Sequence, residues 1–117
     1  MKTILIAEDN DSNYRLMTFI LRNQYNCLRA HNGQEAVELA RTEKPDMVFM
    51  DLKMPVMDGL EATKKIKASN PTLPVVALTA NAFDTDREAA MEAGCDDFLS
   101  KPVSGQKCLE AIIKHTK

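Results

Sequence analysis

The feature that most constrains the fold is a fivefold alternation of a short apolar run with a longer segment of helical periodicity. The apolar runs lie at residues 4–7, 27–30, 47–50, 75–78 and 98–99. The helical patterns lie at residues 11–23, 32–41, 58–68, 85–93 and 104–115. The first, third and fourth runs are continuously apolar, which is typical of strands covered on both faces of a parallel sheet. The alternation predicts the α/β class: a (βα)5, doubly wound, five-stranded parallel sheet with helices on both faces.

Composition narrows the domain count and the possible partners. The length of 117 residues predicts one domain, residues 1–117. The formal net charge is −2 and there is no tryptophan, so we expect no direct contact with nucleic acid. The first apolar run is too short for a signal peptide or for insertion into a membrane. The three cysteines form no CxxC pair and are expected to be reduced thiols, which favours a cytoplasmic location.

Polar residues stand where four of the predicted strands end. Glu8 and Asp9 follow the first strand, Asp51 the third, Thr79 the fourth and Lys101 the fifth. Each of these is, taken singly, an ordinary turn residue. In an open parallel sheet, however, the functional site lies beyond the carboxyl ends of the strands. We therefore expect these side chains to converge at one edge of the sheet.

The chemistry of this set favours phosphoryl transfer. Crowded carboxylates repel one another and raise the pKa of at least one of them. Mg²⁺ would remove that conflict, since it prefers oxygen ligands and is commonly held by one or two carboxylates together with phosphate oxygens. The Asp51 carboxylate can then act as a nucleophile and form an acyl phosphate. Lys101 and the Thr79 hydroxyl would face other phosphoryl oxygens.

On these residues the chain resembles the response-regulator receiver domains of two-component signalling, over essentially its whole length. The resemblance rests on Glu8-Asp9, Asp51, Met54-Pro55, Asp58-Gly59, Thr79-Ala80 and Lys101-Pro102. It implies a flavodoxin-like fold with strand order 2-1-3-4-5. It also implies a signalling switch, in which a sensor histidine kinase or a histidine phosphotransfer protein gives its phosphoryl group to Asp51, and a downstream protein target. The chain would then be no enzyme beyond self-catalysed phosphorylation and autodephosphorylation.

The resemblance also implies how each group at the site acts. Asp9 would ligate Mg²⁺ directly, Glu8 would do so through water, and Lys53 would offer its backbone carbonyl. Asp51 would bind the metal and accept the phosphoryl group, and Lys101 would pair with Asp51 or with that group. Glu8 stands where the family more often has aspartate, which affects the water-mediated part of the metal geometry.

Two residues are implied to move on phosphorylation. Thr79 would be the switch hydroxyl, and Phe98 would occupy the place of a coupled aromatic rotamer. Together they would change the surface formed by the fourth helix, the fifth strand and the fifth helix. The side chains of Lys53 and Asn81 would tune autodephosphorylation, and the Lys101-Pro102 peptide bond would be cis.

The first helix carries a candidate docking residue. Its buried face is predicted to comprise Asn13, Leu16, Met17, Ile20 and Leu21. Phe19 then points outward, because successive side chains are about 100° apart around a helix. With Arg15 nearby, Phe19 would be an apolar anchor with a cationic rim for the helical bundle that presents the phosphohistidine. A lone exposed aromatic without a function is the alternative.

Other functions and arrangements stay open at this stage. A metal-dependent phosphohydrolase of the haloacid-dehalogenase type would need a second aspartate two residues after the nucleophile, where this chain has Lys53. A degenerate receiver that only binds partners would lack some of these site residues, whereas here every position is filled. The chain is either a stand-alone regulator or a receiver cut from a hybrid kinase, and the Met1 start favours the former.

Several other polar residues are expected to have ordinary surface roles. His31 and His115 are expected to be exposed, with no base or metal beside them. Lys64, Lys65 and Lys67 are expected to form a solvated helix face. Met54 and Met57 are expected to pack within their loop rather than to bind a ligand.

Overall fold

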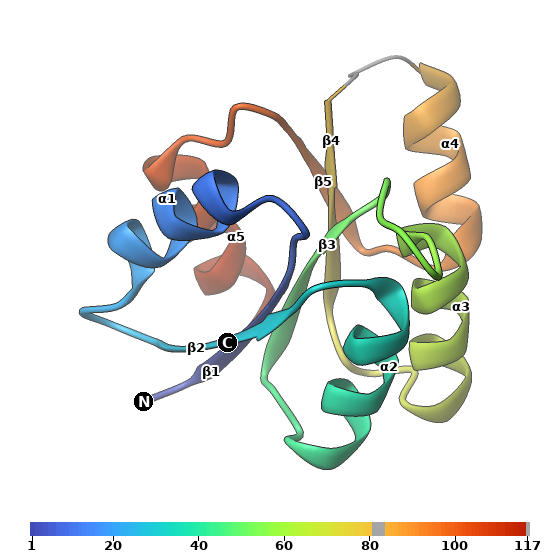
Figure 1. The fold of residues 1–117 in the computed structure, drawn as a ribbon, viewed down its shortest axis with the longest axis horizontal. Helices are drawn as coiled ribbons and strands as arrows, with labels where there is room; N and C mark the ends of the chain where they lie inside the picture. Colours follow the sequence, from blue (N-terminus) through green and yellow to red (C-terminus); the bar gives the residue numbers. More distant parts are fainter. Residues whose placement is uncertain (81–83, 117) are drawn as a thin grey trace.

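A computed structural model describes residues 1–80 and 84–116, and it has the expected alternation of strands and helices (Figure 1). The strands are β1 (Thr3–Ala7), β2 (Asn26–Ala30), β3 (Met47–Asp51), β4 (Val75–Thr79) and β5 (Asp97–Ser100). The helices are α1 (Asp11–Leu21), α2 (Gly33–Thr42), α3 (Gly59–Ser69), α4 (Asp84–Ala93) and α5 (Gly105–His115). The predicted α/β class with five βα units is therefore confirmed.

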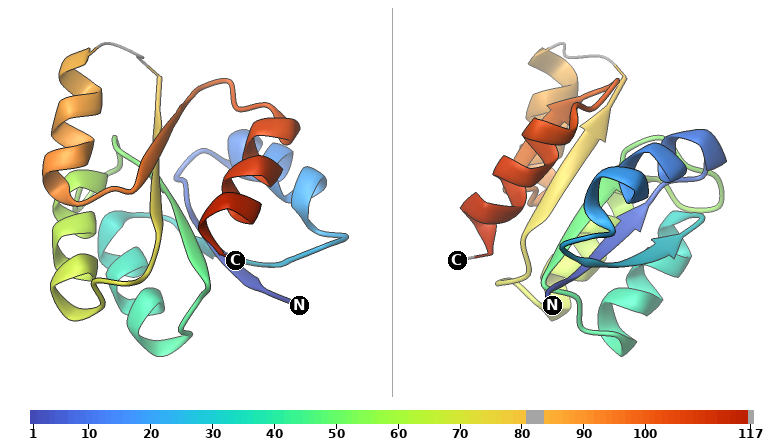
Figure 2. Two further views of the ribbon diagram at one scale, coloured as in Figure 1. Left: turned by 180° about the vertical axis from the view of Figure 1, so that it is seen from behind. Right: turned by 90° about the vertical axis from the view of Figure 1, so that its left-hand side faces the viewer.

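The strands form one parallel sheet in the order β2-β1-β3-β4-β5, which confirms the implied order. Helices α1 and α5 cover one face of the sheet, and α2, α3 and α4 cover the other (Figure 2). The reversal of strand order between β1 and β3 places their carboxyl ends at the switch point, where open α/β sheets bind ligands.

Two hydrophobic clusters, one on each face of the sheet, explain the continuous apolar runs. Alternate residues of β1 point to opposite faces, so that Ile4 and Ile6 lie in the cluster under α1 and α5, while Leu5 and Ala7 lie in the other. Every residue of the central strands β3 and β4 is buried. Burying a side chain such as that of Phe49 contributes about 1.5–3 kcal/mol to folding. These strands hold the site residues at their ends in fixed positions.

Side-chain caps fix where four helices begin. Each cap residue accepts a hydrogen bond from the backbone N–H three positions on, in the pairs Asn10–Asn13, Asn32–Glu35, Asp58–Glu61 and Ser104–Lys107. Such a cap contributes about 1 kcal/mol to stability. Because every strand runs toward the same edge, these helix starts surround the carboxyl end of the sheet.

Some of the expected surface residues prove to have partners. His115 Nε2 lies 3.1 Å from Asp97 Oδ2 with only 15% of its side chain exposed, so the expectation for this residue is wrong. His31 is exposed, but its Nδ1 lies 3.0 Å from Glu35 Oε1, one helical turn along. Lys67 is not part of a solvated face, because its ammonium pairs with Asp96 at 2.7 Å.

Of the helices described, none has the length and apolar character needed to cross a bilayer.

Candidate functional site

The strand ends converge as the sequence predicts. Carboxylate oxygens of Glu8, Asp9 and Asp51 all lie within 4.8 Å of one another. A cavity of about 230 Å³ at this edge of the sheet is lined by all six residues predicted to bind the metal or the phosphoryl group, Glu8, Asp9, Asp51, Lys53, Thr79 and Lys101. They come from the ends of four strands, which the parallel register brings side by side.

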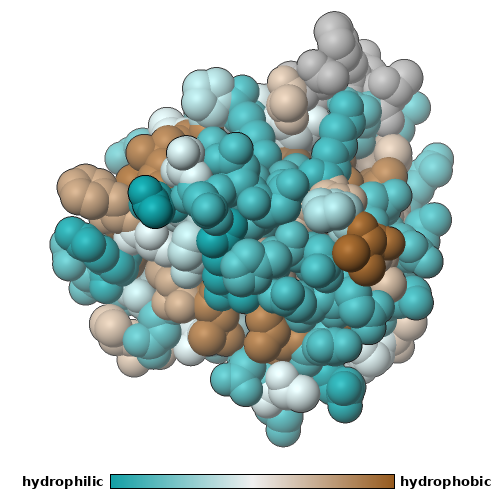
Figure 3. Space-filling view, viewed as in Figure 1, coloured by the Kyte–Doolittle hydropathy of each residue, from teal (hydrophilic) through white to brown (hydrophobic). Residues whose placement is uncertain are grey.

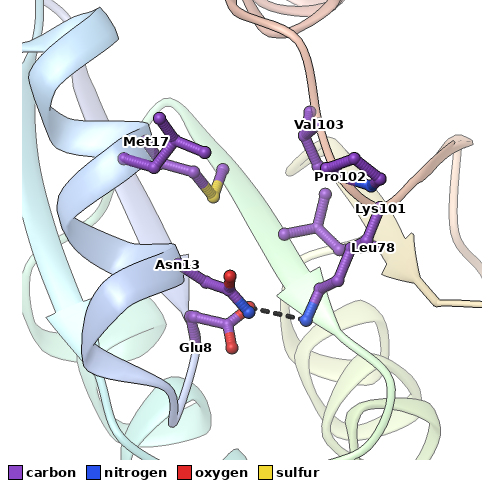
Figure 4. A pocket seen from close by; sticks show the side chains of 8 residues that line it. Glu8, Asn13, Met17, Leu78, Lys101, Pro102 and Val103 are labelled. Carbon is purple, nitrogen blue, oxygen red and sulfur yellow. Dashed lines mark ion pairs between the residues drawn. The ribbon is translucent and has the colours of Figure 1, made fainter.

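Lys101 bridges the two buried carboxylates. Its Nζ lies 2.9 Å from Glu8 Oε2 and 3.0 Å from Asp51 Oδ2, and Figure 4 shows the first of these ion pairs. Glu8 is 1% exposed and Asp51 is 5% exposed, whereas Asp9 is exposed. The other oxygen of Asp51, Oδ1, accepts the backbone N–H of Lys53 at 3.1 Å. Both oxygens of the Asp51 carboxylate are thus held by donors, and its orientation is fixed.

Burial and repulsion set the acid–base properties of this group. Burial raises the pKa of the Asp51 carboxyl, and the charge of Glu8 adds to this, while Lys101 and the Lys53 N–H act against it. Burial acts to lower the pKa of Lys101, but its contacts with Glu8 and Asp51 raise it overall. Lys101 therefore remains a cation. When the carboxylates of Glu8, Asp9 and Asp51 are all ionised, the single charge of Lys101 leaves two negative charges uncompensated.

The donor set fits a hard divalent cation. Glu8 Oε2 is fully buried, and its partner among the described residues is the Lys101 ammonium at 2.9 Å, which it shares with Asp51. One ammonium shared by two buried carboxylates leaves room for a further cation, or a water bound to one, as a second partner of this oxygen. Oxygen ligands with a charge surplus of this size suit Mg²⁺.

Helix α4 contacts both residues that were predicted to move. The Thr79 hydroxyl, which is 5% exposed, donates to Asp86 Oδ2 at 3.5 Å. Phe98 is half-buried against the cluster under α2, α3 and α4, and the Arg87 guanidinium lies 5.2 Å from the centre of its ring. Asp86 and Arg87 could not be identified from the sequence, because nothing in a periodic pattern shows which residues of α4 face β4 and β5. Asn81 lies outside the described residues.

Phe19 is exposed as predicted, with 67% of its surface accessible. The Arg22 guanidinium lies over its ring at 5.1 Å, and Arg15 is exposed on the same helix. The prediction that Leu16 is buried is wrong, since it is 50% exposed. Leu16 lines a small cavity, of about 30 Å³, together with Met17, Pro102 and Val103. Figure 4 shows Met17 of α1 facing Pro102 and Val103 across this cavity. Apolar surface therefore reaches the outside on the α1 side of the molecule (Figure 3).

Gly59 lets helix α3 approach the backbone of Asp51 closely. In the sequence, Asp58-Gly59 has the pattern of a turn followed by a helix cap. A Cβ at Gly59 would meet the Asp51 carbonyl oxygen at 2.2 Å and Leu52 Cα at 2.8 Å. Helix α3 thus packs directly on the backbone of Asp51, and only glycine permits that approach. The implied cis peptide bond at Lys101-Pro102 is present.

Comparison with known proteins identifies the class to which this fold and site belong. The chain belongs to the response regulator receiver domain family, whose model matches residues 4–113. It is thus a receiver of two-component signalling, a phosphoacceptor switch that works with a phosphohistidine donor. It is 38% identical over 114 residues to the polar-differentiation response regulator DivK of Brucella anthropi, a match that covers 95% of this chain and 93% of the relative.

Two solved structures are similar over nearly the whole chain. One is the receiver domain of the sensor histidine kinase PA1611 from Pseudomonas aeruginosa, with magnesium in its active-site cleft (34% identity, TM-score 0.92, 98% of this chain and 97% of that one). The other is the receiver domain of Ssk1 from Saccharomyces cerevisiae, in complex with the histidine phosphotransfer protein Ypd1 (32% identity, TM-score 0.92, 98% of this chain and 88% of that one).

Proposed function

We propose that the Asp51 carboxylate accepts the phosphoryl group, from a sensor histidine kinase or a histidine phosphotransfer protein. The observation that carries this proposal is the position of Asp51: a buried carboxylate held by Lys101, beside Glu8 and Asp9, in an open cavity. The similarity to a receiver solved with Ypd1 supports the class of donor. The single sheet shared by both hydrophobic clusters supports one domain over residues 1–117.

The chemical step is an attack of an Asp51 oxygen on phosphorus. The P–O bond forms as the P–N bond to the donor imidazole breaks, and the imidazole leaves with the bonding electrons. The Lys101 ammonium lies where negative charge collects on the phosphoryl oxygens. A bound divalent cation supplies further charge neutralisation, and Glu8, Asp9, Asp51 and the Lys53 carbonyl are the groups that would hold it. Attack of water on the acyl phosphate later returns the carboxylate and inorganic phosphate.

A turnover enzyme is the second candidate, and the site does not favour it. A phosphohydrolase of the haloacid-dehalogenase type would need an acid two residues after Asp51, and Lys53 stands there. No carboxylate other than those of Glu8 and Asp9 lies beside Asp51 among the described residues grouped at the site. A long-lived acyl phosphate, rather than continuous release of phosphate, distinguishes the switch from the enzyme.

Phosphorylation by acetyl phosphate is expected to require Mg²⁺. Because the three carboxylates repel a phosphoryl donor, chelation with EDTA should slow phosphoryl uptake at least ~10-fold. Asp9→Asn should weaken the response to Mg²⁺, whereas the charge-matched control Glu43→Gln, at the end of α2, should not. Intact mass measured over time reports uptake. Equal rates with Mg²⁺ and with EDTA would contradict the proposed metal site.

We propose that Thr79 and Phe98 move when Asp51 is phosphorylated, and that their movement changes the surface formed by α4, β5 and α5. A phosphoryl group on Asp51 would draw the Thr79 hydroxyl away from Asp86, and Phe98 would leave Arg87 and turn inward. This is a shift between two populated states, which would reshape the surface of α4, β5 and α5 toward a downstream protein. Beryllofluoride, a phosphoryl mimic, should shift the amide resonances of these elements in the wild type but not in Asp51→Asn. Unchanged resonances in the wild type would refute the switch.

We propose that Phe19 anchors the protein donor, with Arg15 at the rim of the contact. Truncating an aromatic anchor commonly costs ~2 kcal/mol or more, which is about 30-fold in affinity. Phe19→Ala should therefore slow transfer from a phosphorylated histidine phosphotransfer protein that is active on the wild type, while acetyl phosphate reacts normally. Met91→Ala, at an exposed apolar residue of α4, is the control. Unchanged transfer from the protein donor would exclude this role.

A further inference from the structure

Arg29 lies behind the site, on the edge strand β2. It is paired with Ile6 of β1, so its side chain leaves the sheet on the same face as that residue, under α1. The guanidinium lies 4.7 Å from the centre of the Tyr14 ring, and its side chain is 17% exposed. No sequence pattern singled out this residue, and it does not line the cavity that holds Asp51.

The Arg29 guanidinium binds the segment Glu8–Asp11, here termed the acidic turn. Its Nε and Nη2 each donate to the Glu8 carbonyl oxygen at 3.2 Å, and Nη2 lies 3.4 Å from the Asp9 carbonyl oxygen. Nη2 also pairs with Asp11 Oδ1 at 2.7 Å, and this contact lowers the pKa of Asp11. One planar cation thus holds three residues of the turn, as the forked geometry of guanidinium allows.

The acidic turn needs such a contact because of its charge. Three of its four residues are acidic, and Asp51 adds a further carboxylate beside Glu8 and Asp9. The repulsion between these groups favours a splayed turn. Two other hydrogen bonds hold the start of the acidic turn. Glu8 N–H donates to the Ala30 carbonyl oxygen at 3.0 Å, and Asn10 N–H donates to Glu8 Oε1 at 3.2 Å. Neither of these bonds holds the Glu8 and Asp9 carbonyls.

We infer that Arg29 is a positioning residue for the proposed metal site: by holding the carbonyls of Glu8 and Asp9 from behind, it keeps their side chains directed into the cavity. The inference rests on the proposed function. Groups that orient metal ligands from behind typically contribute 10–100-fold to metal affinity.

A simple charge effect and a positioning effect predict opposite results. If Arg29 acted only as a nearby positive charge, its removal would strengthen the attraction of Mg²⁺ to the carboxylates. If it positions the turn, its removal weakens binding. Arg29→Gln should therefore raise the Kd for Mg²⁺ at least ~10-fold. Arg29→Lys keeps the charge but cannot bridge two carbonyls and Asp11, so its Kd should lie between those of Arg29→Gln and the wild type.

The experiment is a Mg²⁺ titration followed by the amide resonances of the site, with Arg22→Gln as the matched control. Arg22 also lies over an aromatic ring, that of Phe19, and its loss changes the net charge equally. Its Kd should equal that of the wild type. In EDTA, the hydrogen of the Asn10 backbone amide should exchange with solvent faster in Arg29→Gln than in the wild type. The free energy of unfolding in urea should be the same for both proteins.

The outcomes separate this inference from the function on which it rests. A wild type that shows no Mg²⁺-dependent shifts at Glu8, Asp9 or Asp51 would contradict the proposed metal site itself. A wild type that binds Mg²⁺, with Arg29→Gln binding equally or more tightly, would overturn only the role of Arg29. If Arg29→Gln fails to fold, Arg29→Lys decides: a Kd equal to that of the wild type overturns the inference, and a weaker one supports it.

Discussion

Asp51→Asn is expected to abolish phosphoryl uptake from both acetyl phosphate and a protein donor. An amide is a far weaker nucleophile than a carboxylate, and the Asp51 carboxylate is the one proposed to attack, with its two oxygens oriented at the cavity by Lys101 and the Lys53 N–H. The measurement is the intact mass after incubation with Mg²⁺ and the donor. Asp46→Asn makes the same change just before the other end of β3 and should be phosphorylated normally. A full phosphoryl adduct on Asp51→Asn would refute Asp51 as the acceptor.

Loss of phosphorylation in this variant should not come from unfolding. Burial and the charge of Glu8 raise the pKa of Asp51 in the folded protein. The folded state then binds the proton more tightly than the unfolded state, so this group's contribution to stability falls as the pH rises above its unfolded pKa. A neutral asparagine avoids that loss, and Lys101 keeps Glu8 as a partner. At neutral pH, Asp51→Asn should thus be at least as stable as the wild type in urea.

Gly59→Ala is expected to reduce both stability and phosphorylation. The new Cβ would meet backbone atoms of Asp51 and Leu52 at 2.2 and 2.8 Å, and these cannot rotate away. Either α3 moves or the Asp51 backbone does, at a cost of about 1–3 kcal/mol. Because the acceptor carboxylate is displaced with its backbone, the rate of phosphoryl uptake should also fall, to an extent that intact mass over time measures.

Gly105→Ala is the matched control for this prediction. Gly105 is also the first residue of a helix, after a side-chain cap. The atoms nearest to a Cβ there belong to the Ile20 side chain, the closest at 2.9 Å, and this side chain can change its rotamer. Urea unfolding and acetyl phosphate kinetics should show a much larger loss for Gly59→Ala. Equal effects of the two substitutions would exclude a special role for the contact between α3 and Asp51.

The sequence alone predicts the sheet and the composition of the site. Continuous apolar runs reveal β1, β3 and β4 because these strands are buried on both faces. In a parallel sheet all strand ends meet at one edge, so the residues that follow the strands locate the site without any knowledge of side-chain packing. Glu8, Asp51 and Lys101 could be found in this way.

Residues that act through tertiary placement could not be predicted. Gly59 looks like a turn residue until α3 is seen to pack on the Asp51 backbone. The contacts of Arg29 with the acidic turn cross from one strand to the start of another helix, at a separation that no periodicity reports. Leu16 fits the apolar stripe of α1, but it is 50% exposed in the folded protein. Such contacts depend on how the elements pack, not on local pattern.

The most direct test of this account is to locate the phosphoryl group. The wild type is incubated with acetyl phosphate and Mg²⁺, digested under conditions that preserve acyl phosphates, and mapped by fragmentation mass spectrometry, with hydroxylamine as a probe of the linkage. The account predicts one phosphoryl group, on Asp51, that hydroxylamine releases. A phosphoryl group on any other residue, or one that hydroxylamine leaves in place, would contradict it.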